Sequence, residues 1–390
     1  MSDAGDLERR AARAVAGFTS TRSKGPDAMF GGPGGPTHLV RSRGARVETV
    51  DGRELLDWTM ALGAVALGYA HPRVVEAAAR AARDGAVGPL PHRLEVEVAE
   101  RLCACYPGAG LARWFKTGAE AVQAAVRVAR LATGRERVVH VGYHGWLDGP
   151  TVGAGVPRGT AAMWATAPFD DLPALGERLT AADAAAAIVV EPVIERAPSP
   201  GWLAGVRRLA TEHGAVLVFD EIKTAFRLAA GGAARRWDVQ PDLAVVGKAL
   251  ANGFPLAALL GRAELMARVR ETWISSTLAT EFVALAAAGA VLDVWAEIDV
   301  AAHLARVGTG IRAALEACAA AGGWTVEGMP EMWFLRFSDP ERERRFLLGC
   351  VGRGVLLKRG AYDFPSLAHG DAEVEETMRA VRATLPELGP

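Results

Sequence analysis

Four runs of apolar residues, each about as long as a β-strand, follow one another between residues 184 and 261. Each run is continuous rather than alternating, which is typical of strands that other layers cover on both faces. A helical pattern at 201–214, ended by a glycine, separates the first two runs. This alternation restricts the chain to an α/β fold with a mainly parallel central sheet. The runs are AAAAIVVE (184–191), AVLVFDE (215–221), DLAVVGK (242–248) and PLAALLG (255–261).

The chain has 390 residues, enough for one large domain and one smaller domain. Its start predicts a helix and then an extended arm containing GGPGGP, and residues 46–58 predict a hairpin that turns at Asp51 and Gly52. We expect an N-terminal arm with part of the small domain at 1–58, a large domain at 59–290 and a small α+β domain at 291–390. Further predicted elements are helices at 72–84, 93–106 and 371–385, and strands at ARWF, RVVHV, EMWFLRF and VLL.

The overall charge and hydropathy exclude several classes of protein. The net charge is −1, so no basic surface predicts binding to nucleic acid or to an anionic membrane. No apolar stretch reaches the roughly 20 residues of a membrane span, and the acidic start is unlike a secretory signal. The four cysteines have no metal-binding or redox spacing, which indicates reduced thiols and a cytoplasmic protein.

Two charged residues end apolar runs in the central block. Asp220 follows AVLVF and Lys248 follows LAVVG, so both side chains emerge at the carboxyl edge of a parallel sheet. A structural ion pair would give this pattern. A Schiff-base lysine with an acidic partner for a pyridinium nitrogen would give it too, and that combination is what pyridoxal phosphate requires.

Such a cofactor also needs an anion site and cover for its ring. Gly118 and Ala119 follow a strand and open a helix, where backbone N–H groups can bind a phosphate. Tyr143 follows another strand and could cover the pyridine ring. Taken alone, the first feature is equally consistent with an ordinary glycine turn and the second with packing.

The sequence does not support a dinucleotide-binding site, a P-loop or a metal site. Residues 308–313 match the dinucleotide fingerprint by letters but lie inside a helical pattern with no strand before them. Gly247 and Lys248 are not a phosphate-binding P-loop, because Asp242 and Ala249 occupy the positions of its first glycine and its magnesium-binding hydroxyl. No His-Glu-x-x-His or Cys-x-x-Cys motif predicts a metal.

Nearly the whole chain, from VDGRELLDW to FPSLAH, resembles the class III aminotransferases of fold-type I pyridoxal-phosphate enzymes, and most of all the glutamate-1-semialdehyde aminomutase branch. The resemblance implies that Lys248 forms the Schiff base and that Asp220 pairs with the pyridinium nitrogen. It also implies a homodimer whose active site lies at the subunit interface. The motifs that carry it are KTGAEA, GYHG, Glu191–Pro192, FDEIKTAFR, PDLAVVGKALANGFPLAALLG and STLATEFVALAA.

The other residues of the implied site contact the cofactor. They are Ile222 and Tyr143 on the two faces of the ring, Gly118 and Ala119 at the phosphate, Thr277 reaching the phosphate from the neighbouring subunit, and Glu191 near the ring oxygen.

The chain departs from the family in two motifs and in its N-terminal segment. Ala119 replaces a usual threonine, Ala225 replaces a usual glycine, and the arginine-bearing substrate segment of the aminomutases is not recognisable. We therefore predict an aminotransferase that moves an amino group between a small-molecule donor and a carbonyl acceptor by ping-pong chemistry. The alternatives are an intramolecular aminomutase of the glutamate-1-semialdehyde type, a catalytically silent binding protein and, from another class, a dehydrogenase. The intact Lys248 and Asp220 argue against the silent protein, and the missing fingerprint argues against the dehydrogenase.

Overall fold

The computed structural model describes residues 3–151, 153–180 and 183–389, which form two compact units. One unit combines Met1–His71 with Ala302–Pro390, and the other is Pro72–Ala301. The units divide the chain at other residues than the predicted domains, and the limits 1–58, 59–290 and 291–390 stay predictions.

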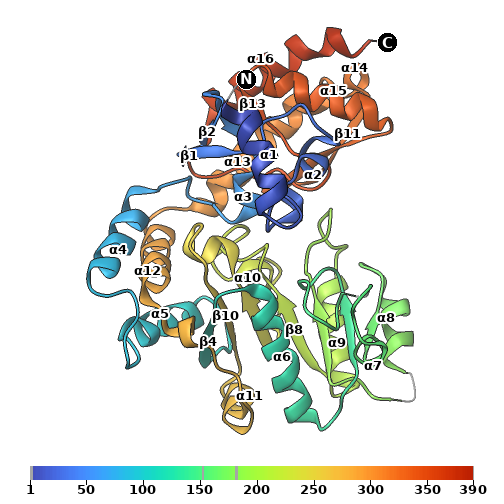
Figure 1. The fold of residues 1–390 in the computed structure, drawn as a ribbon. Coiled ribbons are helices and arrows are strands. Elements are labelled where there is room, and N and C mark those ends of the chain that lie inside the picture. The colour runs from blue at the N-terminus through green and yellow to red at the C-terminus, as the bar shows by residue number, and fades with distance from the viewer. Residues whose placement is uncertain (1–2, 152, 181–182, 390) are drawn as a thin grey trace. The chain divides into compact units, whose positions relative to one another are not determined.

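The unit Pro72–Ala301 is built on a seven-stranded sheet in the order β4-β10-β9-β8-β7-β5-β6 (Figure 1). Neighbouring strands from β9 to β6 are parallel, whereas β10 is antiparallel to both β4 and β9. The α/β class with a mainly parallel sheet is therefore confirmed. The strands are β4 (Leu111–Phe115), β5 (Val138–Val141), β6 (Trp164–Thr166), β7 (Ala187–Val190), β8 (Val216–Asp220), β9 (Leu243–Val246) and β10 (Ala257–Gly261).

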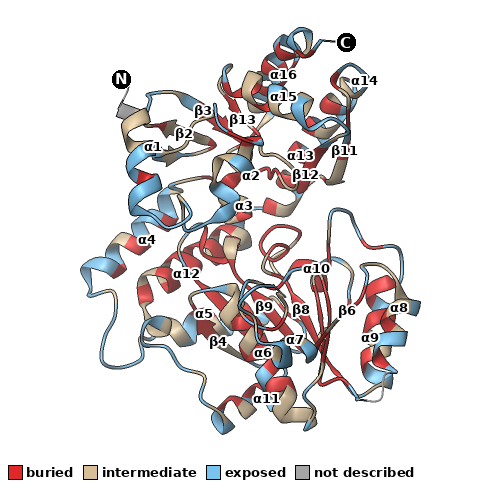
Figure 2. Cartoon of the chain, turned by 45° about the vertical axis from the view of Figure 1, so that its right-hand side comes forward, coloured by how far each residue is buried: buried red, intermediate tan, exposed pale blue. Residues whose placement is uncertain are grey.

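The inner strands are apolar because both of their faces are covered. Every residue of β5, β7, β8, β9 and β10 is buried, and these strands form the red centre of the unit in Figure 2. Alternate strand residues, such as Val189, Val218 and Val245, pack against the alanine- and valine-rich face of α6. The helices of this unit are α4 (Pro72–Arg83), α5 (Leu94–Ala104), α6 (Gly118–Thr133), α7 (Arg158–Ala162), α8 (Leu172–Leu179), α9 (Trp202–Glu212), α10 (Gly232–Arg236), α11 (Ala263–Met266) and α12 (Phe282–Glu297).

The other unit has its own sheet, β1-β2-β3-β13, and a separate hairpin of β11 and β12. The predicted turn at Asp51 and Gly52 is confirmed, because β2 and β3 are antiparallel and Gly52 has φ +80°. The strands are β1 (Leu39–Arg43), β2 (Arg46–Thr49), β3 (Glu54–Asp57), β11 (Trp324–Met329), β12 (Met332–Phe337) and β13 (Val355–Leu356).

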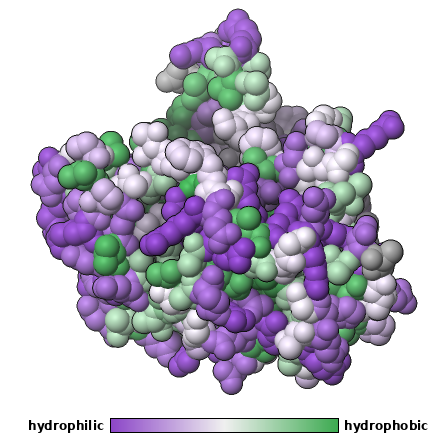
Figure 3. Space-filling view, turned by 90° about the horizontal axis from the view of Figure 1, so that it is seen from below, coloured by the Kyte–Doolittle hydropathy of each residue, from purple (hydrophilic) through white to green (hydrophobic). Residues whose placement is uncertain are grey.

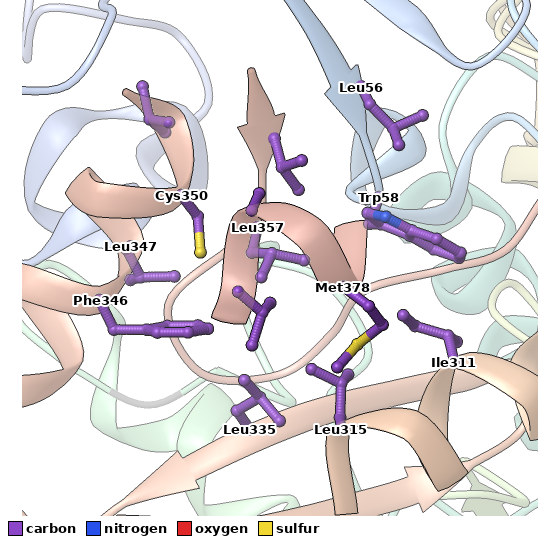
Figure 4. Close-up of a cluster of buried hydrophobic side chains, with 14 of the residues drawn as sticks. Leu56, Trp58, Ile311, Leu315, Leu335, Phe346, Leu347, Cys350, Leu357 and Met378 are labelled. Atoms are coloured by element: carbon purple, nitrogen blue, oxygen red, sulfur yellow. The ribbon is translucent and has the colours of Figure 1, made fainter. Parts of the chain in front are cut away.

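Apolar side chains from both ends of the chain share one core in this unit, which includes Leu56, Trp58, Phe346 and Met378 (Figure 4). Trp58 also donates a hydrogen bond from Nε1 to Thr377 Oγ1 at 2.8 Å. The helices are α1 (Asp3–Ala14), α2 (Pro26–Phe30), α3 (Met60–Gly63), α13 (Val300–Glu316), α14 (Ala319–Gly322), α15 (Pro340–Val351) and α16 (Asp371–Thr384).

The predicted helices at 72–84, 93–106 and 371–385 are confirmed as α4, α5 and α16. The predicted N-terminal arm differs, because it contains the short helix α2. Pro26 occupies the first turn of this helix, and Gly31 ends it with φ +76°, a conformation that glycine adopts without steric cost. Residues 308–313 lie within α13, which confirms the prediction that this stretch is part of a helix and not a dinucleotide-binding turn after a strand.

Candidate active site

Asp220 and Lys248 lie at the carboxyl ends of adjacent parallel strands. Asp220 is the last residue of β8 and pairs with Val245 of β9, while Lys248 lies two residues beyond the end of β9. Asp220 is 3% exposed and accepts a hydrogen bond from Ile222 N at 3.2 Å. The structure thus brings both residues to the sheet edge that the sequence predicted, where open α/β sheets bind ligands.

Lys248 is held in an uncommon backbone conformation. Its φ is +46°, in the left-handed region that a non-glycine residue occupies only at a cost of roughly 1–2 kcal/mol. Lys248 begins the 3₁₀ turn η2 (Lys248–Ala251), in which the next three residues are buried. Such strain is concentrated at functional sites, where the surrounding structure over-determines the conformation.

The Lys248 amine is easier to deprotonate than an ordinary lysine. Burial and, to a smaller extent, the positive charge of Lys223 lower its pKa to about 8, while Glu191 and Asp220 oppose the shift. At pH 7 roughly a tenth of such an amine is neutral, against less than a thousandth for an unperturbed lysine. A neutral amine is the form that attacks a carbonyl.

His144 orients Asp220, a contact that the sequence did not predict. The ring is buried, with Nδ1 at 2.8 Å from Asp220 Oδ2 and Nε2 at 3.1 Å from the carbonyl oxygen of Val141. A carboxylate and a carbonyl are both acceptors, so both ring nitrogens must carry hydrogen for both bonds to form. The motif GYHG contained this residue, but a histidine without a known partner gives no signal in the sequence.

The start of α6 has the features of an anion site. Thr117 caps the helix, and its side chain accepts from Glu120 N while the Glu120 carboxylate accepts from Thr117 N at 2.9 Å. A Cβ on Gly118 would lie 2.3 Å from Ile222 Cδ1, so only a glycine at this position allows the Ile222 side chain to lie this close to the start of α6. Gly145 packs equally tightly on Ala119, where an added Cβ would lie 2.5 Å from the Ala119 side chain. The structure therefore brings the start of α6, at Gly118 and Ala119, close to Ile222 and Gly145.

Glu191 links two loops of the same sheet edge. Its Oε2 accepts from Tyr143 N at 3.0 Å, and its Oε1 lies 2.6 Å from Lys223 Nζ. The Tyr143 side chain is 68% exposed, so its backbone rather than its ring is fixed in the single chain. Thr277 begins η4 (Thr277–Thr280) and is exposed. The ion pair with Lys223 was not predicted, because Glu191 and Lys223 lie on different loops.

The arrangement suits a phosphorylated aldehyde cofactor with a basic ring nitrogen. It combines an amine of lowered pKa, a buried carboxylate held by a histidine, and a helix N-terminus at Gly118 against which Ile222 packs closely. Within the described residues no group of three or more His, Cys, Asp or Glu side chains could hold a metal ion. The described part of the chain also contains no helix long and apolar enough to cross a membrane.

The sequence profile of the family "Aminotransferase class-III" matches residues 33–385. Glutamate-1-semialdehyde 2,1-aminomutase of Roseiflexus castenholzii is 36% identical over an alignment of 395 residues, which covers 91% of this chain and 91% of that one. Among solved structures, the pyridoxal-phosphate internal aldimine form of the Sphingopyxis FumI protein gives a TM-score of 0.93 at 26% identity, covering 98% of this chain and 96% of that one. An omega-transaminase from Sphaerobacter thermophilus gives 0.89 at 25% identity, covering 100% and 98%. The chain therefore belongs to the class III aminotransferases, which are pyridoxal-phosphate-dependent enzymes of fold type I.

Proposed function

We propose that Lys248 and Asp220 serve a reaction that moves an amino group from a small-molecule donor to a carbonyl acceptor in two half-reactions. The observation that supports this most is the Lys248 amine of lowered pKa beside a buried carboxylate at the carboxyl edge of the sheet. When bound, pyridoxal phosphate supplies an aldehyde that takes up the amine and a ring that withdraws electrons from the neighbouring carbon.

The residues of the chain then divide the work of binding and proton transfer. Lys248 attaches the cofactor and, once released, moves a proton at the carbon next to the substrate nitrogen. Asp220 carries the negative charge that faces the ring nitrogen, and His144 holds that carboxylate in place. We assign Ile222 and Tyr143 to the two faces of the ring.

The remaining proposed contacts lie at the periphery of the cofactor. The first N–H groups of α6, at Gly118 and Ala119, bind the phosphate. Glu191 lies on the side of the ring oxygen. Thr277 is exposed in the single chain, which suits a role at the phosphate of a neighbouring subunit in a homodimer. Sedimentation at several protein concentrations tests the dimer. The four free cysteines support a cytoplasmic location.

The test of the central assignment is Lys248→Ala. Borohydride should fix the cofactor on Lys248 in the natural protein, and peptide mapping should find it there. The variant should lose this attachment and essentially all turnover while keeping its fold. Label on Lys116, Lys223 or Lys358 instead would sink the assignment.

The aminomutase alternative rests on the relative from Roseiflexus castenholzii. An aminomutase keeps its substrate through both half-reactions, whereas a transaminase releases a keto product. GGPGGP, at 31–36, forms a conformationally restricted arm in place of the arginine-bearing segment of the aminomutases. We therefore expect release of product.

One experiment distinguishes the two reactions. The enzyme is loaded with pyridoxamine phosphate and given one acceptor without any donor. A transaminase performs one stoichiometric turnover and stops. Continued conversion of glutamate 1-semialdehyde to its isomer without a donor would establish the aminomutase instead.

A further inference from the structure

A second lysine lies in the candidate active site. Lys223 follows Asp220 by three residues, is 9% exposed, and places Nζ 2.6 Å from Glu191 Oε1. The Glu191 carboxylate is itself only 14% exposed and also accepts from Tyr143 N. The pair therefore links the loop after β8 to the loops after β7 and β5, all at the edge where Lys248 emerges.

Burial alone does not explain why this ion pair is present. Two charges taken out of water lose hydration energy that their attraction repays only in part, so such a pair is a weak source of stability. Buried charges of this kind occur at sites where their field acts on a third group. Here the third group is the amine of Lys248.

Two carboxylates and two cations act on that amine. Asp220 and Glu191 favour the protonated form of Lys248, whereas Lys223 and Arg227 favour the neutral form, with Lys223 the stronger. Glu221, next to Asp220, is occupied by Thr224 and by the N–H groups of Ala233 and Ala234. His144 is occupied by Asp220. A neutral side chain at position 223 would leave the Glu191 carboxylate without its ammonium partner at the edge where Lys248 emerges.

We infer that Lys223 is a positioning residue, whose ammonium, held 2.6 Å from Glu191 Oε1, offsets the negative charge of that carboxylate at the edge of the sheet where Lys248 emerges. This inference rests on the proposed function in one respect, namely that Lys248 is the residue that attaches the cofactor. Lys223 itself makes and breaks no bond. Its positive charge offsets the negative charge of Glu191. That carboxylate can therefore lie near the cofactor without favouring the protonated form of the Lys248 amine.

The experiment measures how the reactivity of Lys248 depends on pH. The enzyme in its pyridoxamine-phosphate form, in which Lys248 is free, is acetylated briefly with trace acetic anhydride between pH 6 and 11. Peptide mass spectrometry then gives the acetylated fraction of Lys248, and the midpoint of its pH profile is the readout. In the natural protein the midpoint should lie below that of an ordinary lysine.

Substitution of Lys223 should move this midpoint in a defined direction. Lys223→Met and Lys223→Gln should raise it by about one pH unit, the size of effect that a nearby charge exerts. Lys223→Arg, which keeps the charge, should hold it near the natural value. Glu191→Gln should lower it, and the double variant Lys223→Met/Glu191→Gln should return toward the natural value.

Lys116→Met is the matched control, because Lys116 forms a similar pair with Glu281 at 2.6 Å and similar exposure. It should leave the midpoint unchanged. An unmoved midpoint in both Lys223→Gln and Glu191→Gln would overturn the inference, even where borohydride still fixes the cofactor on Lys248. Fixation on a different lysine would overturn the proposed function as well, so the two failures are distinguishable.

Discussion

His144 shows how single residues set the chemistry of the site. Its Nδ1 lies 2.8 Å from Asp220 Oδ2 and its Nε2 lies 3.1 Å from the carbonyl oxygen of Val141, so the ring is fixed between two acceptors. The Asp220 carboxylate is in turn fixed by its contact with His144 Nδ1 and by the hydrogen bond that it accepts from Ile222 N. An anionic carboxylate is the form that can keep a pyridine nitrogen protonated.

Asp220→Asn tests this assignment. The amide keeps the size of the side chain, so the variant should still bind the cofactor. A neutral amide, however, cannot hold the ring nitrogen protonated. Its proton-transfer rate in single turnover should fall by at least ~100-fold, the usual contribution of a positioned acid–base group. The loss should lie in the chemical step rather than in substrate binding. An unchanged single-turnover rate would remove Asp220 from its role.

At the scale of elements, the close approach of α6 to the loop after β8 decides what can bind. Thr117 caps α6, and Gly118 leaves the space that Ile222 fills. The same side chain lies beside Gly247, where an added Cβ would be 3.7 Å from Ile222 Cγ1. Ile222 therefore lies between the proposed phosphate site and the turn that carries Lys248.

Gly118→Ala should loosen the cofactor without unfolding the chain. The new methyl group would meet Ile222 Cδ1 at 2.3 Å and force that side chain to move, at a cost of roughly 1–3 kcal/mol. We expect cofactor affinity to fall by about tenfold, measured by absorbance during dialysis. Gly176→Ala in α8, where nothing lies within 4 Å, is the control and should bind normally. Equal affinity in both variants would contradict the proposed phosphate site.

At the scale of the whole molecule, each compact unit has its own core. The face of the molecule in Figure 3 is largely hydrophilic, with apolar residues scattered over it. The stability of the Pro72–Ala301 unit also depends on a buried carboxyl, Glu221, which accepts from Ala233 N and Ala234 N at 2.8 Å each and from the Thr224 hydroxyl. Burial raises its pKa to about 7 despite these bonds.

This carboxyl should make the stability of the protein depend on pH. Between pH 4.5 and 7 the folded state holds a proton that the unfolded state has released, so stability decreases as pH rises through this range. The decrease from this group is about 3 kcal/mol and is complete above pH 7.

Glu221→Gln should remove this component. Both oxygens of Glu221 accept from backbone N–H groups, so the side-chain nitrogen of the glutamine would face the N–H of Ala233 or Ala234, and two donors cannot bond to each other. The variant should therefore be less stable at pH 5 by roughly 1–3 kcal/mol. Its deficit should shrink as pH rises to 7, when measured by urea unfolding. The exposed Glu375→Gln should follow the natural protein. Parallel curves for Glu221→Gln and the natural protein would refute the pH component.

The sequence alone predicted the inner strands of the large sheet and the positions of Asp220 and Lys248 at its edge. Continuous apolar runs identified the buried strands, because a strand covered on both faces cannot alternate. The Asp51–Gly52 turn followed from local backbone preferences. Asp220 and Lys248 could be placed at one edge because parallel strands end on the same side.

Only the tertiary structure decided which distant residues meet. β10 inserts antiparallel between β4 and β9, which no local pattern predicts. His144 meets Asp220 across 76 residues, and Lys223 meets Glu191 from another loop. Such pairs depend on strand order, which follows from packing all the strands and helices of the Pro72–Ala301 unit around one sheet. The contact of His144 with Asp220 and the ion pair of Lys223 with Glu191 therefore depend on which strands lie side by side, and the sequence alone does not predict them.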